Sequence, residues 1–196
     1  MRSGRRSRRG YAVVGRRRFL AQALLVAALG LARRVWAQGA SFLRYYRLPS
    51  PVAVPLDDML ARWRARLFVA DAVTLDSAAV PNQPIRITGM VVRTGPAGGN
   101  TPDRFQAVCL RCPHEGCDVE FVADPSKLPP ELVSEIGHPV AEPVYVCPCH
   151  NSTFNVETGE RLAGPAPRGL YRFRVTGVSA TAVEIGEVEE DLLLFV

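Results

Sequence analysis

The chain has 196 residues, 47% of them hydrophobic and 22% charged, which is enough for one folded domain with a hydrophobic core and a tail. Its formal net charge of +5 is unevenly distributed. Residues 1–37 contain ten arginines and no acidic residue, whereas the remainder has 14 Lys and Arg against 19 Asp and Glu. Because the body is acidic, we exclude nucleic acid as a partner.

The first 37 residues resemble an export signal. Residues 16–20 read Arg-Arg-Arg-Phe-Leu, which is similar to the twin-arginine motif. The apolar run at 19–32 has 14 residues, which is typical of a signal-peptide core and short of the roughly 20 that a membrane span needs. Residues 35–37 are a candidate cleavage site. Cleavage and retention as a membrane anchor both stay open, and we favour retention because tilting or flanking residues accommodate a short span.

Residues 38–68 are predicted to connect this segment to the folded domain. Three prolines between positions 49 and 55 favour a stiff, semi-extended chain. Residues 56–66 are predicted to form a short helix, because two aspartates occupy its first turn and arginines follow towards its end.

From Val69 onwards, short β-prone runs alternate with turn signals. Residues 170–175 alternate cleanly between apolar and polar side chains. A short helix is predicted at 131–136. We therefore predict an all-β antiparallel sandwich over residues 69–196. Its expected strands lie at 85–93, 104–110, 143–147, 170–176 and 181–185.

Two short boxes contain six of the eight cysteines and histidines in the chain. The first, residues 112–117, reads Cys-Pro-His-Glu-Gly-Cys, and the second, residues 147–152, reads Cys-Pro-Cys-His-Asn-Ser. Each offers one Cys and one His close together, with one further Cys. This is the composition of a mixed iron–sulfur site, in which two thiolates bind one iron and two imidazoles bind the other.

The pattern C-x-H-x-G-C followed by C-P-C-H-x-S resembles the Rieske iron–sulfur protein family, over roughly residues 70–186. The resemblance implies one [2Fe-2S] cluster per chain. Cys112 and Cys147 would ligate one iron, and His114 and His150 would ligate the other. The boxes would lie on two loops of the sandwich that form a cluster-binding subdomain.

The same resemblance pairs Cys117 with Cys149 in a disulfide that ties the two loops together. Such a bond requires an oxidising compartment or burial, which agrees with export. Cys109 is then left over. It forms a C-x-x-C with Cys112, but it ends an apolar strand, so we interpret it as a buried structural thiol.

Three further positions match residues around the cluster in the family, and two depart from the family pattern. Ser152 would donate its hydroxyl to a bridging sulfide, and Gly164 and Pro165 begin a proline-rich loop that would pack against the cluster. Asn151 stands where the family usually has glycine. Phe154 stands where high-potential members have tyrosine, and its ring cannot donate a hydrogen bond to a ligand sulfur.

Glu115 replaces the usual apolar residue beside the first histidine. A carboxylate ~8 Å from the cluster, at an effective dielectric constant of ~20, opposes reduction by at most about 2 kcal/mol. Glu115 and Phe154 both indicate a reduction potential below that of the tyrosine-containing members. Such a potential fits a low-potential quinol such as menaquinol.

The resemblance implies the Rieske subunit of a cytochrome bc-type complex in the bacterial cytoplasmic membrane, with its head on the periplasmic face. Its partners would be cytochrome b-type and c-type subunits, and its substrate would be quinol. His114 and His150 would face outward, and one of them would take the quinol proton as the cluster takes an electron. The alternative is the small Rieske subunit of an exported oxidase resembling arsenite oxidase.

Two other classes are disfavoured. A ring-hydroxylating oxygenase needs a second iron site with two further histidines, and only His138 remains, which we interpret as a surface-loop residue. A structural zinc site with the same four ligands is chemically allowed, but this spacing is unusual for it. Residues 118–146 separate the boxes by more than is usual in the family, and this segment could shape partner docking.

Overall fold

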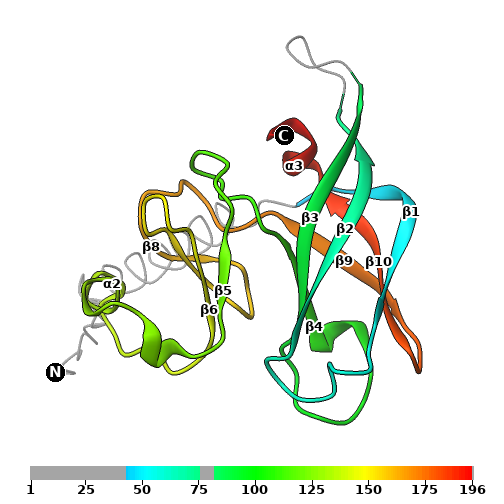
Figure 1. Cartoon of the computed structure of the whole chain (residues 1–196). Coiled ribbons are helices and arrows are strands. Elements are labelled where there is room, and N and C mark those ends of the chain that lie inside the picture. The colour runs from blue at the N-terminus through cyan, green and yellow to red at the C-terminus, as the bar shows by residue number, and fades with distance from the viewer. Residues whose placement is uncertain (1–42, 76–81, 196) are drawn as a thin grey trace, which may run out of the picture. The chain divides into compact units, whose positions relative to one another are not determined.

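The structure, a computed structural model, describes residues 43–75 and 82–195 (Figure 1). The predicted signal or anchor at 1–37 lies outside these residues, so its membrane role stays a prediction. Within the described ranges, no helix is both long enough and apolar enough to cross a bilayer.

The larger sheet is antiparallel and has six strands in the order β1-β10-β9-β4-β3-β2. Its main core contains Phe68 and Phe173, whose ring centroids lie 5.0 Å apart in an edge-to-face arrangement. The prediction of an all-β antiparallel fold is confirmed. The strands are β1 (Tyr45–Pro55), β2 (Ala65–Val73), β3 (Pro84–Arg93), β4 (Phe105–Cys109), β9 (Arg172–Val178) and β10 (Ala182–Glu189).

The predicted connector at 38–68 is wrong from Tyr45 onwards, because β1 and the first part of β2 belong to the large sheet. β1 pairs with β10, and β2 pairs with β3 along its whole length. The prolines are tolerated because β1 is an edge strand, where a missing N–H costs no ladder hydrogen bond on the open side. The register of β1 also shifts between Arg47 and Val52.

The predicted helix at 56–66 is also wrong, because turns occupy this segment up to the start of β2 at Ala65. The turns bury Leu56 and Met59, which are 2% and 0% exposed. The aspartates that suggested a helix start instead pair across the turn with Arg66, at 3.0 Å for Asp57 and 2.8 Å for Asp58.

The smaller sheet is inserted between β4 and β9 and has the order β5-β6-β7-β8. All three of its strand pairings are antiparallel. Its strands are β5 (Glu120–Val122), β6 (Val144–Val146), β7 (Thr153–Asn155) and β8 (Arg161–Ala163). This sheet and its loops form the subdomain that holds both boxes.

Short helices complete the described part. α2 (Pro130–Ile136) confirms the helix predicted at 131–136 and lies beside β8 at the edge of the small sheet (Figure 1). α3 (Glu190–Phe195) follows β10. Two 3-10 turns, η1 (Pro102–Arg104) and η2 (Pro125–Lys127), lie in the connections.

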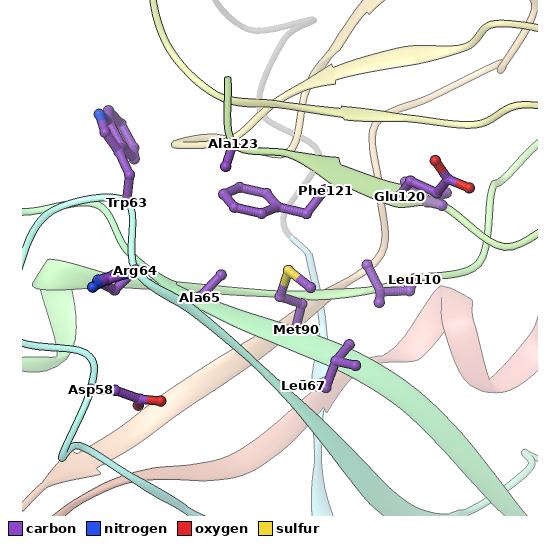
Figure 2. Close-up of a pocket in the computed structure, with 11 residues that line it drawn as sticks. Asp58, Trp63, Arg64, Ala65, Leu67, Met90, Leu110, Glu120, Phe121 and Ala123 are labelled. Carbon is purple, nitrogen blue, oxygen red and sulfur yellow. The ribbon is translucent and has the colours of Figure 1, made fainter. Parts of the chain in front are cut away.

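A groove of about 900 Å³ lies between the large sheet and β5. Figure 2 shows Trp63, Met90 and Phe121 facing into it. Its other lining side chains are mostly apolar, and three are charged: Asp58, Arg64 and Glu120. Its lining includes none of the cysteines and histidines of the two boxes.

Candidate metal centre

The first box, residues 112–117, is a tight loop between β4 and β5. The backbone N–H of Cys112 donates to the carbonyl oxygen of Cys117 at 2.8 Å, and the N–H of Gly116 donates to the carbonyl of Cys112 at 2.9 Å. Gly116 has a φ of +73°, which favours glycine, and Arg111 donates to its carbonyl at 3.2 Å. These bonds hold the loop in one conformation.

The second box, residues 147–152, is a matching loop between β6 and β7. The N–H of Cys147 donates to the carbonyl of Ser152 at 2.8 Å, which closes the loop. Asn151, the departure from the usual glycine, is exposed and has a φ of +60°. This left-handed conformation explains why glycine suits the position, and asparagine is among the side chains that tolerate it best.

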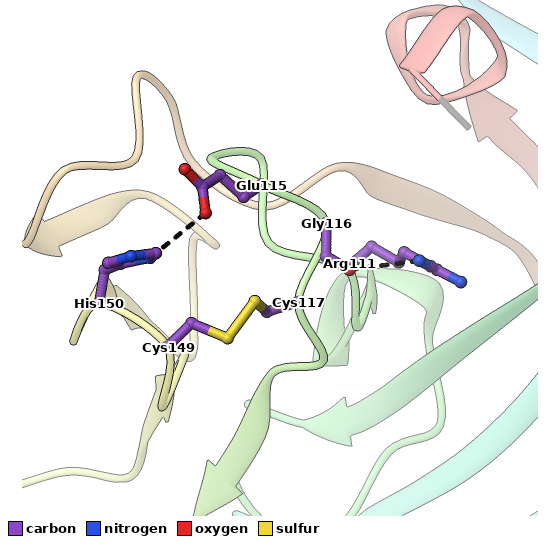
Figure 3. The surroundings of a disulfide bond; sticks show 6 residues. All are labelled: Arg111, Glu115, Gly116, Cys117, Cys149 and His150. Atoms are coloured by element: carbon purple, nitrogen blue, oxygen red, sulfur yellow. Dashed lines mark hydrogen bonds and ion pairs between the residues drawn. A yellow bond between two sulfur atoms is a disulfide. The ribbon is translucent and has the colours of Figure 1, made fainter.

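The predicted disulfide between Cys117 and Cys149 is confirmed. It joins the two loops across 32 residues of sequence, with the Cα atoms 6.6 Å apart. Figure 3 shows the bond beneath Glu115 and His150. The disulfide therefore fixes the distance between the two boxes.

The remaining cysteines and histidines of the boxes lie in two pairs. Cys112 and Cys147 are free thiols, 1% and 2% exposed. The rings of His114 and His150 meet edge to face, with centroids 4.8 Å apart. His114 is half-buried and His150 is exposed. The fold thus brings the two buried thiols close to each other and the two imidazoles into contact, each pair with one member from each box.

The chemistry of these groups fits a metal cluster. The Nδ1 atom of His114 is buried and has no hydrogen-bond partner within the described residues, so it is available as a ligand. Burial raises the pKa of the Cys112 thiol, and the neighbouring Cys147 raises it further. Two adjacent buried thiolates are unfavourable without a cation between them, whereas a bound metal ion deprotonates its thiol ligands.

A carboxylate lies beside the exposed histidine. The Oε2 atom of Glu115 is 3.8 Å from the Nδ1 atom of His150 (Figure 3). Their side chains are 60% and 47% exposed, so water screens this contact. The predicted negative charge next to the ligand loops is therefore present.

The proline-rich loop that begins at Gly164 contacts Ser152 of the second box. The Oγ atom of Ser152, a residue that is 0% exposed, accepts a hydrogen bond from the N–H of Ala166 at 3.1 Å. Gly164 has a φ of +85°, and a Cβ atom there would lie 2.4 Å from the Cα atom of Ser152. Only glycine therefore fits at position 164, where the backbone lies this close to that of Ser152. Pro165 lies between these two contact points.

Phe154 is fully buried on β7, directly opposite Tyr145 on β6. The Tyr145 hydroxyl is buried and has no hydrogen-bond partner in the described part of the chain. Burial raises the pKa of this phenol. Both rings belong to the core that contains Cys112 and Cys147, so the two thiols lie in an aromatic, buried environment.

One cysteine and one histidine, Cys109 and His138, lie outside the boxes, and both have the environment that the sequence predicted. Cys109 is fully buried, and burial raises the pKa of its thiol to about 12, as expected for a structural cysteine. His138 is exposed, with its Nδ1 atom 3.1 Å from the carbonyl oxygen of Pro139. It is an ordinary surface-loop residue.

Two residues near the site were not predicted. Glu135 on α2 accepts a hydrogen bond from the N–H of Gly164 at 3.0 Å, and Arg161 donates to the carbonyl of Gly164 at 2.8 Å. The unusual length of the segment between the boxes pointed to the helix. Nothing in the sequence pointed to these partners, because they are 29 and 3 residues from Gly164 and follow no motif.

The fold and the site present a mixed set of cysteine and histidine side chains suited to a metal centre. Residues 79–174 match the sequence profile of the Rieske [2Fe-2S] domain. The chain therefore contains a Rieske domain and binds a [2Fe-2S] cluster, and both boxes lie within the matched range. No curated protein gives a significant match to the chain.

Proposed function

We propose that this chain is the Rieske subunit of a cytochrome bc-type complex, which takes an electron and a proton from quinol and passes the electron to a c-type cytochrome. Cys112 and Cys147 bind one iron, and His114 and His150 bind the other. The observation that supports this proposal most is the pair of adjoining imidazoles, of which His150 is exposed.

The bound cluster supplies a one-electron acceptor whose charge is less negative than that of an all-thiolate cluster. Residues of the chain hold the ligand loops in place and contact the quinol. The Cys117–Cys149 disulfide joins the two ligand loops, and the Gly164–Pro165 turn lies against the second one at Ser152. The exposed ring of His150 offers a nitrogen that can hydrogen-bond a quinol hydroxyl and accept its proton.

The N-terminal segment completes the proposal. The arginine motif at 16–20 would direct the folded protein through the twin-arginine route, and the apolar run at 19–32 would anchor it in the cytoplasmic membrane. The head would then lie on the periplasmic face, where a disulfide is stable. Partners in this arrangement are a cytochrome b-type and a cytochrome c-type subunit.

Purification of the full chain from membranes in mild detergent tests this function. We expect it to copurify with b-type and c-type haem, and the purified complex to reduce cytochrome c with added quinol. Release of the chain as a soluble periplasmic protein bound to a large oxidase subunit, without haem b, would contradict the proposal. That outcome would support the arsenite-oxidase-like alternative.

A further inference from the structure

The helix inserted between the two boxes contacts the loop that covers the site. α2 is held on the small sheet by Leu132, which is 4% exposed and packs with Leu128 and Val144 in a separate core. This packing brings Glu135, in the last turn of α2, to Gly164. The carboxylate of Glu135 accepts a hydrogen bond from the N–H of Gly164 at 3.0 Å.

Hydrogen bonds from two side chains hold both backbone polar groups of Gly164, its N–H and its carbonyl oxygen. While Glu135 binds its N–H, the guanidinium of Arg161 donates to its carbonyl oxygen at 2.8 Å. The residue adopts a φ of +85° and lies directly against the backbone of Ser152. A shift of Gly164 therefore moves the start of the loop relative to Ser152.

The next contact in the loop binds the side chain of Ser152. The N–H of Ala166, two residues after Gly164, donates to the Ser152 Oγ atom at 3.1 Å. Because this bond occupies one lone pair of the oxygen, it restricts the directions in which the hydroxyl proton can point. Ser152 also closes the second box, because its carbonyl oxygen accepts a hydrogen bond from the N–H of Cys147 at 2.8 Å, so its buried side chain lies on the loop that carries this proposed ligand.

These contacts form a continuous connection from the inserted helix to the loop of the second box. We propose that Glu135 is a positioning residue, which fixes the Gly164–Ala166 turn and through it the hydroxyl of Ser152 beside the cluster. The inference rests on the proposed ligation of iron by the two boxes. It gives the long segment between the boxes a role in tuning the cluster.

The sign of the effect follows from charge. Reduction adds negative charge to the cluster and its sulfur ligands, and a hydroxyl that donates to such a sulfur stabilises that charge. Loss of the Glu135 contact frees the turn, so the Ser152 hydroxyl is less well oriented and the reduced state is less favoured. Because Glu135 is exposed and Arg161 still holds the turn, the effect is limited in size.

The test compares the full-length holoprotein with the variants Glu135→Ala and Glu135→Gln. We expect Glu135→Ala to shift the reduction equilibrium about threefold towards the oxidised state, which is ~28 mV at about 59 mV per tenfold for one electron. Glutamine retains an acceptor oxygen, so Glu135→Gln should restore most of the midpoint. Glu131→Ala, which removes an exposed carboxylate from the first turn of the same helix, is the matched control.

A double-mutant cycle separates this path from a general effect of charge or stability. In a Ser152→Ala background, Glu135→Ala should leave the midpoint unchanged, because the hydroxyl through which it acts is gone. An equal shift in both backgrounds, or an equal shift in Glu131→Ala, would overturn the proposal.

Hydrogen exchange gives a readout that does not depend on the cluster. The peptide containing Gly164 should exchange about threefold faster in Glu135→Ala than in the unmodified protein or in Glu135→Gln. Unchanged exchange would exclude the positioning role even if the variants fail to load iron. An absent cluster signal in the unmodified protein would instead contradict the ligand assignment, so the two failures are distinguishable.

Discussion

The carboxylate of Glu115 lies 3.8 Å from the Nδ1 atom of His150, on the two loops that the Cys117–Cys149 disulfide joins. A negative charge at this position opposes the uptake of an electron by the cluster. Glu115→Gln, which removes the charge and keeps the shape, should therefore raise the midpoint potential by about 20–60 mV.

A redox titration followed by circular dichroism or EPR checks the Glu115 prediction. Because the side chain is 60% exposed, the difference between the two proteins should shrink as the salt concentration rises. A midpoint that falls in the variant, or a difference independent of salt, would contradict a through-space charge effect.

The disulfide closes a loop of 32 residues and is expected to stabilise the subdomain strongly. Replacing both cysteines, Cys117→Ser with Cys149→Ser, should lower the free energy of unfolding by about 3 kcal/mol. Thermal denaturation should show a melting temperature ~6–12 °C lower. The unmodified protein treated with a reductant should behave like the double variant, and equal melting temperatures would show that the loops are held together without the bond.

Gly164 and Gly98 offer a matched pair for testing the close approach to Ser152. Their φ angles are +85° and +86°, but a Cβ atom at Gly98 would meet nothing within 4 Å, whereas one at Gly164 would lie 2.4 Å from the Ser152 Cα atom. Gly98→Ala should cost about 1 kcal/mol of stability through backbone strain alone. Gly164→Ala should cost about 3 kcal/mol or more and accelerate cluster loss. Similar costs in chemical denaturation would refute the steric contact.

The unpartnered hydroxyl of Tyr145 predicts an unusual gain in stability. Tyr145→Phe keeps the ring contacts with Phe121 and removes a buried polar atom that forms no hydrogen bond within the described residues. The free energy of unfolding should rise by about 1 kcal/mol, or at least not fall. A loss of stability together with a lowered midpoint potential would indicate that the hydroxyl donates to the bound cluster.

The local motifs made much of the site predictable. Each box keeps its Cys and His within three residues of each other, and the short loops preserve that proximity in the fold. The pairing of Cys117 with Cys149 followed from the family pattern. The helix α2 was recognisable because Gly137 ends it, with a φ of +82° that suits glycine after a helix.

The elements that were missed depend on contacts distant in sequence. The prolines of β1 read as a linker, because nothing local shows that the strand will pair with β10 at a sheet edge. β2 has two alanines beside Phe68 on its inward face and Leu67 and Val69 on its exposed face, so its apolar alternation is weak. The contact of Glu135 with Gly164 likewise exists only once α2 packs on the small sheet.

The most direct test of the central claim is the EPR spectrum of the reduced full-length protein, measured together with its iron and sulfide content. The account predicts a Rieske-type signal that disappears in Cys112→Ser. The signal should persist in Cys109→Ala, because the Cys109 thiol is buried outside the two boxes and is not a proposed ligand. A protein that binds zinc and no iron, or a signal that survives the loss of Cys112, would contradict the assignment of the cluster to the two boxes.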